Sequence, residues 1–200
     1  MAGDSSEKPY SELTDEDLMA LVQQDDEVAF ELLAERYQHP LLTFIARFLG
    51  PGSHTKDILQ ETYIRVWRHR HQYKTVAKFS TWVYTIAGNL SKTELRRRKI
   101  RRMVPIRTGG ENPEDEGIDV EDKGQATDEL ARRNEIREMV NREIEKLPDA
   151  YRGAVILRDL QNLTYEEIAE VLNVPIGTIK SRVNRGRARL QKTLAVLREP

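Results

Sequence analysis

LTYEEIAEVLNVPIGTIKSRVNRGRAR, from Leu163 to Arg189, is the stretch that decides the fold. Thr164 and Glu167 have the spacing of a capping box, in which each side chain accepts the backbone amide of the other residue at the start of a helix. Apolar residues then recur at the helical period as far as Asn173, which tolerates the left-handed conformation that often ends a helix. Pro175 fits the first turn of a further helix. The stretch therefore predicts two helices that meet just after Asn173.

The second of these helices carries an apolar stripe on one side and cations on the others. No acid occurs between Gly177 and Leu197, whereas Lys and Arg recur at nearly every position outside the stripe. A helix-turn-helix with a cationic second helix is typical of proteins that read the DNA major groove, although most charge runs are only solvated helix faces. Lys and Arg can donate to guanine, and Asn can pair with adenine. We expect DNA contacts from Thr178, Lys180, Ser181, Arg182, Asn184, Arg185 and Arg189.

Charge is segregated along the chain, although the total is close to zero. The 200 residues allow one or two domains, 32% of them are charged and 6% are aromatic, and the net charge is −1. Residues 92–107 are mostly basic, 111–129 are mostly acidic, and the carboxyl end is basic again. This asymmetry is more informative than the total, because each cationic segment can attract nucleic acid on its own.

Several kinds of site are excluded by composition. The chain has no cysteine, so it has neither disulfides nor thiolate metal sites. His39, His54, His69 and His71 give no ligand set, and no glycine-rich phosphate loop or paired carboxylates beside a nucleophile are present. We therefore expect no metal, no cofactor and no enzymatic activity. The polar start and the lack of any apolar run near ~20 residues favour a soluble intracellular protein.

Helical periodicity runs through the first hundred residues, and no strand pattern is present. A pattern capped by Thr14 or Asp15 is broken at Asp25-Asp26 and then continues to Gly50. Two further patterns run from Lys56 to His71 and from Ser80 to about Arg101. Trp82 falls on an apolar stripe and is expected in the core, whereas Tyr84 lies off that stripe.

The periodicity stops between Pro105 and about Ala126, where Gly, Pro, Asp and Glu dominate. It resumes at Thr127, and Pro148 opens another helix that runs through Leu160. The sequence therefore predicts an all-α protein of two small helical domains joined by a flexible acidic linker. The expected boundaries are a disordered start at 1–10, a first domain at 11–104, the linker at 105–127 and a second domain at 128–197.

Three segments of the chain, 57–63, 79–89 and 176–182, resemble successive signatures of the extracytoplasmic-function (ECF) sigma factors. These are compact bacterial sigma factors that consist of a region-2 and a region-4 domain, and the resemblance extends from about Leu13 to Leu194. It implies a cytoplasmic subunit of bacterial RNA polymerase that selects promoters. It also implies that the second domain reads the −35 element and that an anti-sigma factor holds the protein in check.

The resemblance places a polymerase interface on the helix after Lys56. We expect this helix to bind the clamp helices of the largest polymerase subunit. The flap of the second-largest subunit is a further expected partner of the chain. Spacings of three, four and seven put Asp57, Gln60, Glu61 and Ile64 on one helical face, where polar groups can meet a basic helix. From spacing alone, this face is equally well explained as a solvated helix surface whose charged residues pair within the helix. The interface residues expected are Asp57, Gln60, Glu61, Ile64 and Arg65.

The resemblance also implies a site for the −10 element in the first domain. Asn89 matches a residue that holds a flipped base in a loop between two helices, and Tyr84 is a weaker candidate for base stacking. The basic run beyond Asn89 can neutralise neighbouring phosphates and release counterions, or it can simply complement the negative pole of a helix end. The cations in question are Lys92, Arg96, Arg97, Arg98, Lys99, Arg101 and Arg102.

Alternatives to this interpretation remain at this point. The acidic linker either mimics nucleic acid in the polymerase channel or serves as an inert tether. The whole chain is either a sigma factor or a polymerase-independent regulator that uses only its helix-turn-helix. A protein-binding adaptor explains neither cationic cluster.

Overall fold

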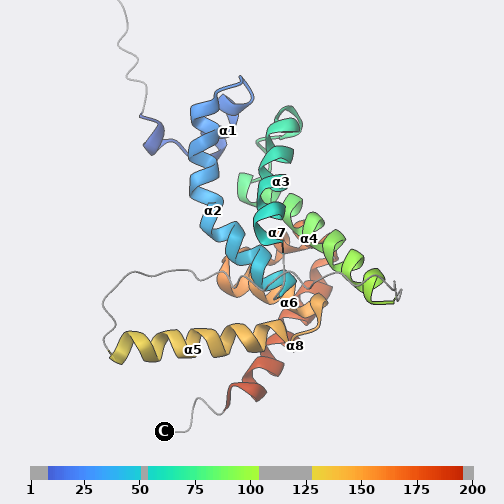
Figure 1. The fold of residues 1–200 in the computed structure, drawn as a ribbon. Helices are drawn as coiled ribbons and strands as arrows, with labels where there is room; N and C mark the ends of the chain where they lie inside the picture. Colours follow the sequence, from blue (N-terminus) through green and yellow to red (C-terminus); the bar gives the residue numbers. More distant parts are fainter. Residues whose placement is uncertain (1–8, 51–53, 104–127, 196–200) are drawn as a thin grey trace, which may run out of the picture.

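The computed structural model describes residues 9–50, 54–103 and 128–195, which form helices joined by short turns, with no strand among them (Figure 1). This confirms the all-α prediction for the described part of the chain. The expected linker at 105–127, and most of the expected start at 1–10, lie outside the described residues. The helices are α1 (Asp15–Val22), α2 (Glu27–Leu49), α3 (Thr55–Arg68), α4 (Phe79–Met103), α5 (Asp128–Glu145), α6 (Asp149–Val155), α7 (Tyr165–Leu172) and α8 (Ile176–Thr193), with a π-helical turn at Ile156–Leu160.

Local side-chain chemistry sets the helix boundaries of the first domain. Thr14 caps α1 in a capping box with Asp17, whose amide lies 3.1 Å from the Thr14 hydroxyl. Asp25 has a φ of 67°, and the carboxylate of Asp26 accepts from the amide of Ala29 at 2.9 Å, so the chain turns here before α2 begins. The predicted break at Asp25-Asp26 is confirmed.

The core of the first domain lies between α2, α3 and α4. Leu41 and Phe44 from α2, Val66 from α3 and Val83 from α4 are all buried in it. Trp82 packs at the edge of this core, with its ring centroid 5.3 Å from that of Tyr73. The core position expected for Trp82 is confirmed only in part, because its side chain is partly buried and packs against the core.

The helix-turn-helix forms as its sequence predicts. The Thr164 amide donates to the Glu167 carboxylate at 2.7 Å, and the Glu167 amide donates to the Thr164 hydroxyl at 3.2 Å. Asn173 ends α7 in the left-handed conformation, with φ 53° and ψ 57°. Pro175 is the N-cap of α8, whose apolar stripe packs against α6. The turn therefore fixes the direction in which α8 presents its cations.

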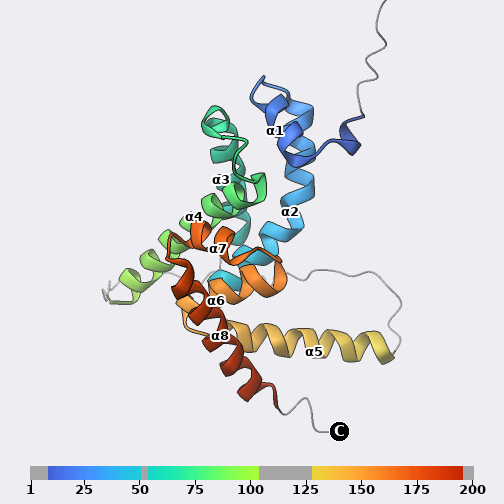
Figure 2. The same cartoon turned by 180° about the vertical axis from the view of Figure 1, so that it is seen from behind.

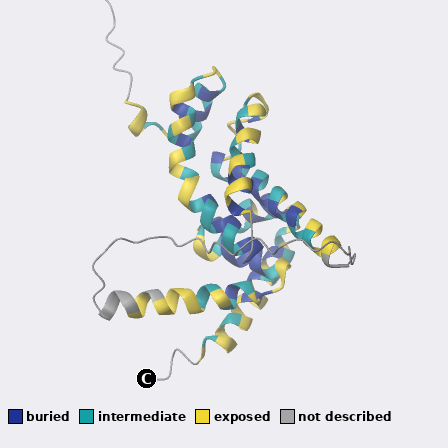
Figure 3. Cartoon of the chain, viewed as in Figure 1, coloured by how far each residue is buried: buried dark blue, intermediate teal, exposed yellow. Residues whose placement is uncertain are grey.

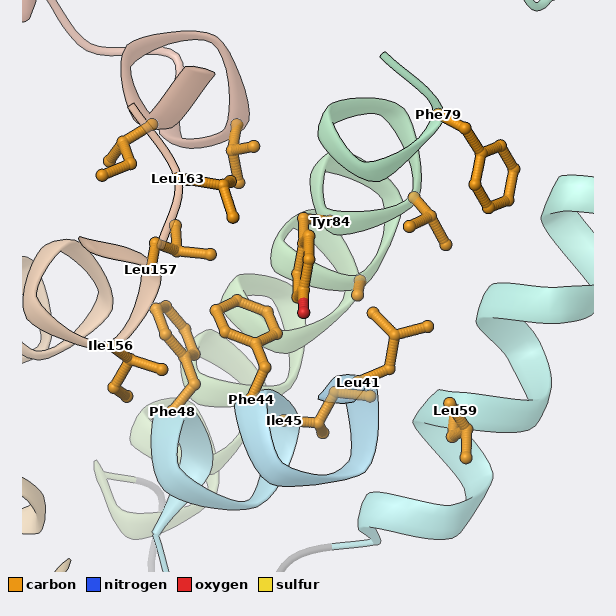
Figure 4. Packing of buried hydrophobic residues seen from close by; sticks show 14 of the residues in the cluster. Leu41, Phe44, Ile45, Phe48, Leu59, Phe79, Tyr84, Ile156, Leu157 and Leu163 are labelled. Atoms are coloured by element: carbon orange, nitrogen blue, oxygen red, sulfur yellow. The ribbon is translucent and has the colours of Figure 1, made fainter. Parts of the chain in front are cut away.

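The two domains pack together into one body with a continuous core. Figure 4 shows Leu157 and Leu163 of the second domain next to the aromatic side chains of the first. These aromatic residues are Phe44, Phe48 and Tyr84, and all five side chains belong to one buried cluster. Helix α7 lies along α4, as the view from behind also shows (Figure 2). Helix α5 extends from this body, and most of its described side chains between 132 and 142 are exposed (Figure 3).

Gly186 is the point of closest approach between α8 and α6. A Cβ atom there would lie 2.5 Å from Cγ2 of Val155 and 3.5 Å from Cβ of Tyr151. Gly186→Ala should therefore lower the free energy of unfolding by about 1–2 kcal/mol, since overpacking outweighs the gain in helix propensity. Urea unfolding measures this change. Gly177→Ala on the same helix is the control, because no atom lies within 4 Å of its Cβ position; equal effects of the two substitutions would contradict the packing argument.

Candidate nucleic-acid interface

A row of polar residues runs along one face of α8. Thr178, Arg182, Arg185 and Arg189 follow one another at spacings of four, three and four, so they lie in one row along the helix. Arg185 and Arg189 are exposed, and Arg182 is half-buried beside the first domain. The guanidinium of Arg189 lies over the ring of Tyr151, 5.0 Å from its centroid. This row is able to follow a phosphate backbone.

The remaining predicted residues of α8 lie around the same exposed half of the helix. Lys180 and Asn184 are exposed, and the Lys180 ammonium lies 5.9 Å from the centroid of the Tyr165 ring. The Ser181 hydroxyl donates to the carbonyl of Thr178 at 2.9 Å. Arg187 is different, because its guanidinium donates from both Nε and Nη2 to the carboxylate of Asp159. That pairing ties α8 to the turn before α7 and leaves Arg187 a mainly structural role.

Asn89 does not lie in a loop, so that part of the −10 expectation is wrong. It is an exposed residue in the middle of α4, which is continuous from Phe79 to Met103. Residues 88–92 contain no proline, and the Ser91 hydroxyl bonds to the carbonyl of Ala87 within the helix at 2.8 Å. A polar side chain at this position can still reach DNA, but only from a helix surface.

Tyr84 also lies elsewhere than expected. It is 3% exposed, and its ring meets that of Phe44 edge-on at 5.4 Å. Its hydroxyl donates to the side-chain oxygen of Gln161 in the second domain at 2.5 Å, and burial raises its pKa. The expectation that Tyr84 lies off the buried stripe is wrong, because α7 and the turn before it cover this side of α4. In this arrangement Tyr84 cannot stack on a base.

The cations of α4 divide into free and engaged groups. Arg96, Arg97, Lys99 and Arg101 are exposed, whereas the side chain of Arg102 lies outside the described residues. Lys92 donates to the carbonyl of Leu172 at 2.9 Å. Arg98 bonds to Glu94 and to the carbonyl of Leu49, each at 3.3 Å. Only the exposed cations of this helix are available to phosphates without rearrangement.

A cationic cleft of about 800 Å³ lies between the domains. It brings Lys92 and Arg96 of α4 together with Arg182 of α8, opposite the acids Glu145 and Asp149. Burial lowers the pKa of the Lys92 ammonium, and the nearby charges of Arg182 and Arg96 lower it further. Residues expected to contact two different DNA elements therefore share one cleft.

The five residues expected to contact polymerase all lie on α3, and the contact itself stays a prediction. Asp57 and Gln60 are exposed, and Glu61 pairs with Arg65 along the helix at 2.7 Å. Ile64 is 42% exposed beside these polar groups. The structure thus brings all five predicted residues to the surface of one helix, with an apolar side chain among charged neighbours.

Two features were missed by sequence reasoning. The segment between α3 and α4 ends in a turn where Val76 is 98% exposed and Lys74 and Thr75 are also exposed. This turn is a helix break beside the core of the first domain. The absence of helical periodicity at residues 73–78 is the sequence pattern that could have predicted it. The second feature is Arg152, a buried cation that joins the two domains; its sequence context resembles that of any surface arginine.

Comparison with known families agrees with this architecture. The Sigma-70 region 2 family matches residues 33–101, and the Sigma-70 region 4 family matches residues 137–190. The chain is 33% identical to the RNA polymerase sigma-H factor of Pseudomonas aeruginosa over 194 residues, which cover 92% of this chain and 95% of the relative. It is 34% identical to the ECF RNA polymerase sigma-E factor of Escherichia coli over 186 residues, covering 88% and 92% respectively.

Two solved structures resemble the whole chain. CnrH in complex with the cytosolic domain of CnrY has a TM-score of 0.64, with 22% identity over 91% of this chain and 97% of that one. RpoE in complex with the anti-sigma factor NepR from Bartonella quintana has a TM-score of 0.62, with 24% identity over 84% and 97%. These likenesses concern the fold.

The helical fold, the cationic helix-turn-helix and the matches over both domains define a promoter-selecting class of transcription factor. The chain belongs to the ECF sigma factors of RNA polymerase. It is an alternative sigma factor that directs promoter-specific transcription, and the polymerase-independent alternative is not favoured. Within residues 9–50, 54–103 and 128–195, no helix is both long and apolar enough to cross a membrane.

Arg185 and Arg187 of α8 offer a matched test of the predicted DNA face. Arg185→Ala should weaken promoter binding by the complex of this chain with core polymerase and reduce the salt slope of log K by about one, as expected for one lost phosphate contact. Arg187→Ala should change the slope much less, because its guanidinium is already bound to Asp159. Filter binding over a range of KCl concentrations measures both slopes. A larger change from Arg187→Ala would place the DNA face elsewhere.

Proposed function

We propose that this sigma factor binds core RNA polymerase through the exposed face of α3, reads the −35 element with α8 and opens the −10 element with its first domain. The observation that carries the proposal is the row from Thr178 to Arg189, on a helix whose direction is fixed by the turn at Asn173. Arg185 and Arg189 of this row are exposed, and Thr178 and Arg182 are half-buried. Recognition helices present their polar face to the major groove in this way.

The −35 assignment rests on the chemistry of α8. Arg182 and Arg185 can each donate two hydrogen bonds to guanine, and Asn184 can pair with adenine. Arg189, held over Tyr151, suits a phosphate contact at the far end of the row. Because the apolar stripe of α8 is buried against α6, the helix is supported from behind while this face meets DNA.

The polymerase assignment rests on the anatomy of the α3 face. Protein interfaces gain most of their affinity from a few apolar or aromatic anchors surrounded by polar residues that exclude water. Ile64 has this position, with Gln60 beside it and the Glu61–Arg65 pair on its flank. We assign the clamp helices of the largest polymerase subunit to this face, and the flap of the second-largest subunit to the second domain.

The −10 assignment is revised by the position of Asn89. A base that is held between two helices needs a helix break, and in the first domain that break is the exposed turn at 73–78 rather than residue 89. We therefore propose that the segment from Lys74 to Lys78 contacts the unpaired bases. Asn89 and the exposed cations Arg96 and Arg97 would contact the phosphate backbone of the DNA. Cationic tracks beside base-capturing surfaces are the usual arrangement for single strands.

We further propose that an anti-sigma factor regulates the protein. The support is that both similar solved structures are described as complexes with such regulators or with a cytosolic partner domain. The protein would then act in the bacterial cytoplasm, where core polymerase is found, and would have no catalytic activity of its own.

Run-off transcription with purified core polymerase tests the proposed function. The full-length chain, combined with core enzyme and a promoter library, should produce transcripts from a defined subset of promoters that core enzyme alone ignores. Sequences selected this way should share two conserved blocks, one for each domain. DNA retention that is the same with and without polymerase would instead identify a polymerase-independent regulator.

Ile64→Ala should weaken binding to core polymerase by at least about tenfold, because truncation of an interface anchor usually costs 1 kcal/mol or more, here roughly 1.4. Val28→Ala is the matched control, since Val28 is a β-branched residue, 55% exposed, on α2. Competition with a labelled sigma factor for core enzyme measures both affinities. Equal losses for the two variants would show that the α3 face has no special part in assembly.

A further inference from the structure

The turn at residues 73–78 is held at its start by a glutamine from a distant part of the chain. Gln23, the residue that follows α1, donates from Nε2 to the carbonyl of Arg70 at 2.9 Å and to the carbonyl of Tyr73 at 2.9 Å. A side-chain amide group has two hydrogens to donate, so both have an acceptor here. The Gln23 side chain therefore joins the 3₁₀ turn at Arg70–Gln72 to the first residue of the exposed segment.

A second residue of α1 holds the other end of the turn. The Glu16 carboxylate accepts from the backbone amide of Phe79, the first residue of α4, at 3.0 Å. The first amides of a helix lack intrahelical partners and carry the positive end of the dipole, so a carboxylate stabilises them. Glu16 and Gln23 are seven residues apart, which places them on the same face of the helix, two turns from each other. Helix α1 thus fixes both ends of the turn.

The backbone of the turn is also closed by contacts of its own. The Tyr73 hydroxyl donates to the carbonyl of Ala77 at 2.6 Å, and the Ala77 amide donates to the carbonyl of Lys74 at 3.1 Å. The side chains between these contacts are turned to solvent instead, since Lys74, Thr75 and Val76 are all exposed. The turn therefore presents its side chains from a backbone that is held in one shape.

We propose that Gln23 and Glu16 are positioning residues for the −10 element, which hold the turn in the shape that captures unpaired bases. The inference rests on the proposed function, which assigns Lys74 to Lys78 to those bases. A loop that becomes ordered only on binding loses affinity to the cost of ordering, whereas a loop already held in its bound shape does not. Both side chains act through the turn, because both are half-buried against the protein.

Loss of either contact should loosen the turn more than it loosens the domain. The residues that flank the turn are kept in place by the core, because Tyr73 is 5% exposed and Phe79 is 2% exposed. Arg70 also donates to the carboxylate of Asp25 at 2.9 Å, which retains the preceding 3₁₀ turn. Segments with few buried apolar contacts open locally at a lower cost than the global fold. We therefore expect an effect on base recognition rather than on assembly with polymerase.

Gln23→Ala and Gln24→Ala form a matched pair that tests this role. Gln24 is the next residue, but its exposed side chain donates to the carbonyl of Ala20 within its own helix at 3.2 Å. The full chain is combined with core polymerase and the strongest promoter from the run-off selection, and with versions of that promoter that carry single base-pair changes in the −10 block. Permanganate reactivity of unpaired thymines measures the rate of opening on each template.

The quantity compared is discrimination, the ratio of the opening rates on the original and the changed promoters. Because one mismatched base pair normally changes binding by a factor of about 5–150, Gln23→Ala should lower discrimination by at least about threefold. Gln24→Ala should leave it unchanged. The ratio does not depend on how much of the protein is folded, since that fraction cancels. Unchanged discrimination in Gln23→Ala, or an equal loss in Gln24→Ala, would overturn the positioning role of Gln23.

The Glu16 end of the turn gives an independent pair of variants, which also covers a Gln23→Ala chain that does not fold. Glu16→Gln keeps a side-chain oxygen that can accept the Phe79 amide, so it should retain more discrimination than Glu16→Ala. Equal discrimination by these two variants would overturn the role of Glu16.

Hydrogen exchange tests the same inference without DNA. In the full chain, peptides that cover residues 73–79 should exchange at least about fivefold faster in Gln23→Ala than in Gln24→Ala, because local opening no longer breaks the two bonds from the glutamine. Peptides from α3 should exchange at the same rate in both variants. Equal exchange over 73–79 would show that Gln23 does not hold the turn.

Substitutions in the turn itself separate this inference from the proposed function. Val76 is 98% exposed, so Val76→Ser alters the surface of the turn without altering the core. If Val76→Ser and Lys74→Ala both leave −10 preference unchanged, the assignment of the turn to unpaired bases is overturned. If they change that preference and Gln23→Ala does not, only the positioning role is overturned.

Discussion

The buried guanidinium of Arg152 is the interaction on which the joined structure depends. It is 8% exposed and bonds to the carbonyls of Leu147 and Phe48 and to the carboxylate of Asp149. A buried charge is tolerated only when its donors are satisfied, because desolvation is otherwise costly. One of these acceptors belongs to the first domain, so separation of the domains leaves Arg152 with a donor to be satisfied by water. Gly153, beside it, allows the Phe48 ring to approach closely.

The same helices position the functional surfaces outside this joint. Helix α3 packs on α2 and α4 through its buried face and keeps the Ile64 face free. Helix α8 packs on α6 and α7 and buries Ile179, Val183 and Gly186, whereas its cations Arg185 and Arg189 stay exposed. The Ile64 face of α3 and the exposed cations of α8 are therefore accessible, whereas Arg182 lines the cleft between the domains and the side of α4 that carries Tyr84 and Lys92 is covered by the second domain.

Local chemistry explains which features could be predicted from the sequence. The capping box at Thr164, the left-handed stop at Asn173 and the break at Asp26 depend on residues within three positions of one another, so their side chains determine the outcome. Tyr84 could not be placed in this way, because its partner Gln161 is 77 residues away in the chain. Arg152 is a similar case, since an arginine that is buried by another domain has the same local sequence as one in water.

Lys92 takes part in the contact between the two domains and is also one of the cations predicted to bind DNA. A carbonyl at a helix end is a neutral acceptor with a partial negative charge, whereas a DNA phosphate carries a full charge and gives a stronger, charge-assisted hydrogen bond. The carbonyl of Leu172 is thus a weaker partner for this ammonium than a phosphate would be. Burial lowers the pKa of Lys92, and the nearby charges of Arg182 and Arg96 lower it further, so both desolvation and repulsion oppose this contact. The cations that suit DNA phosphates are for that reason also groups that weaken this contact between the two domains.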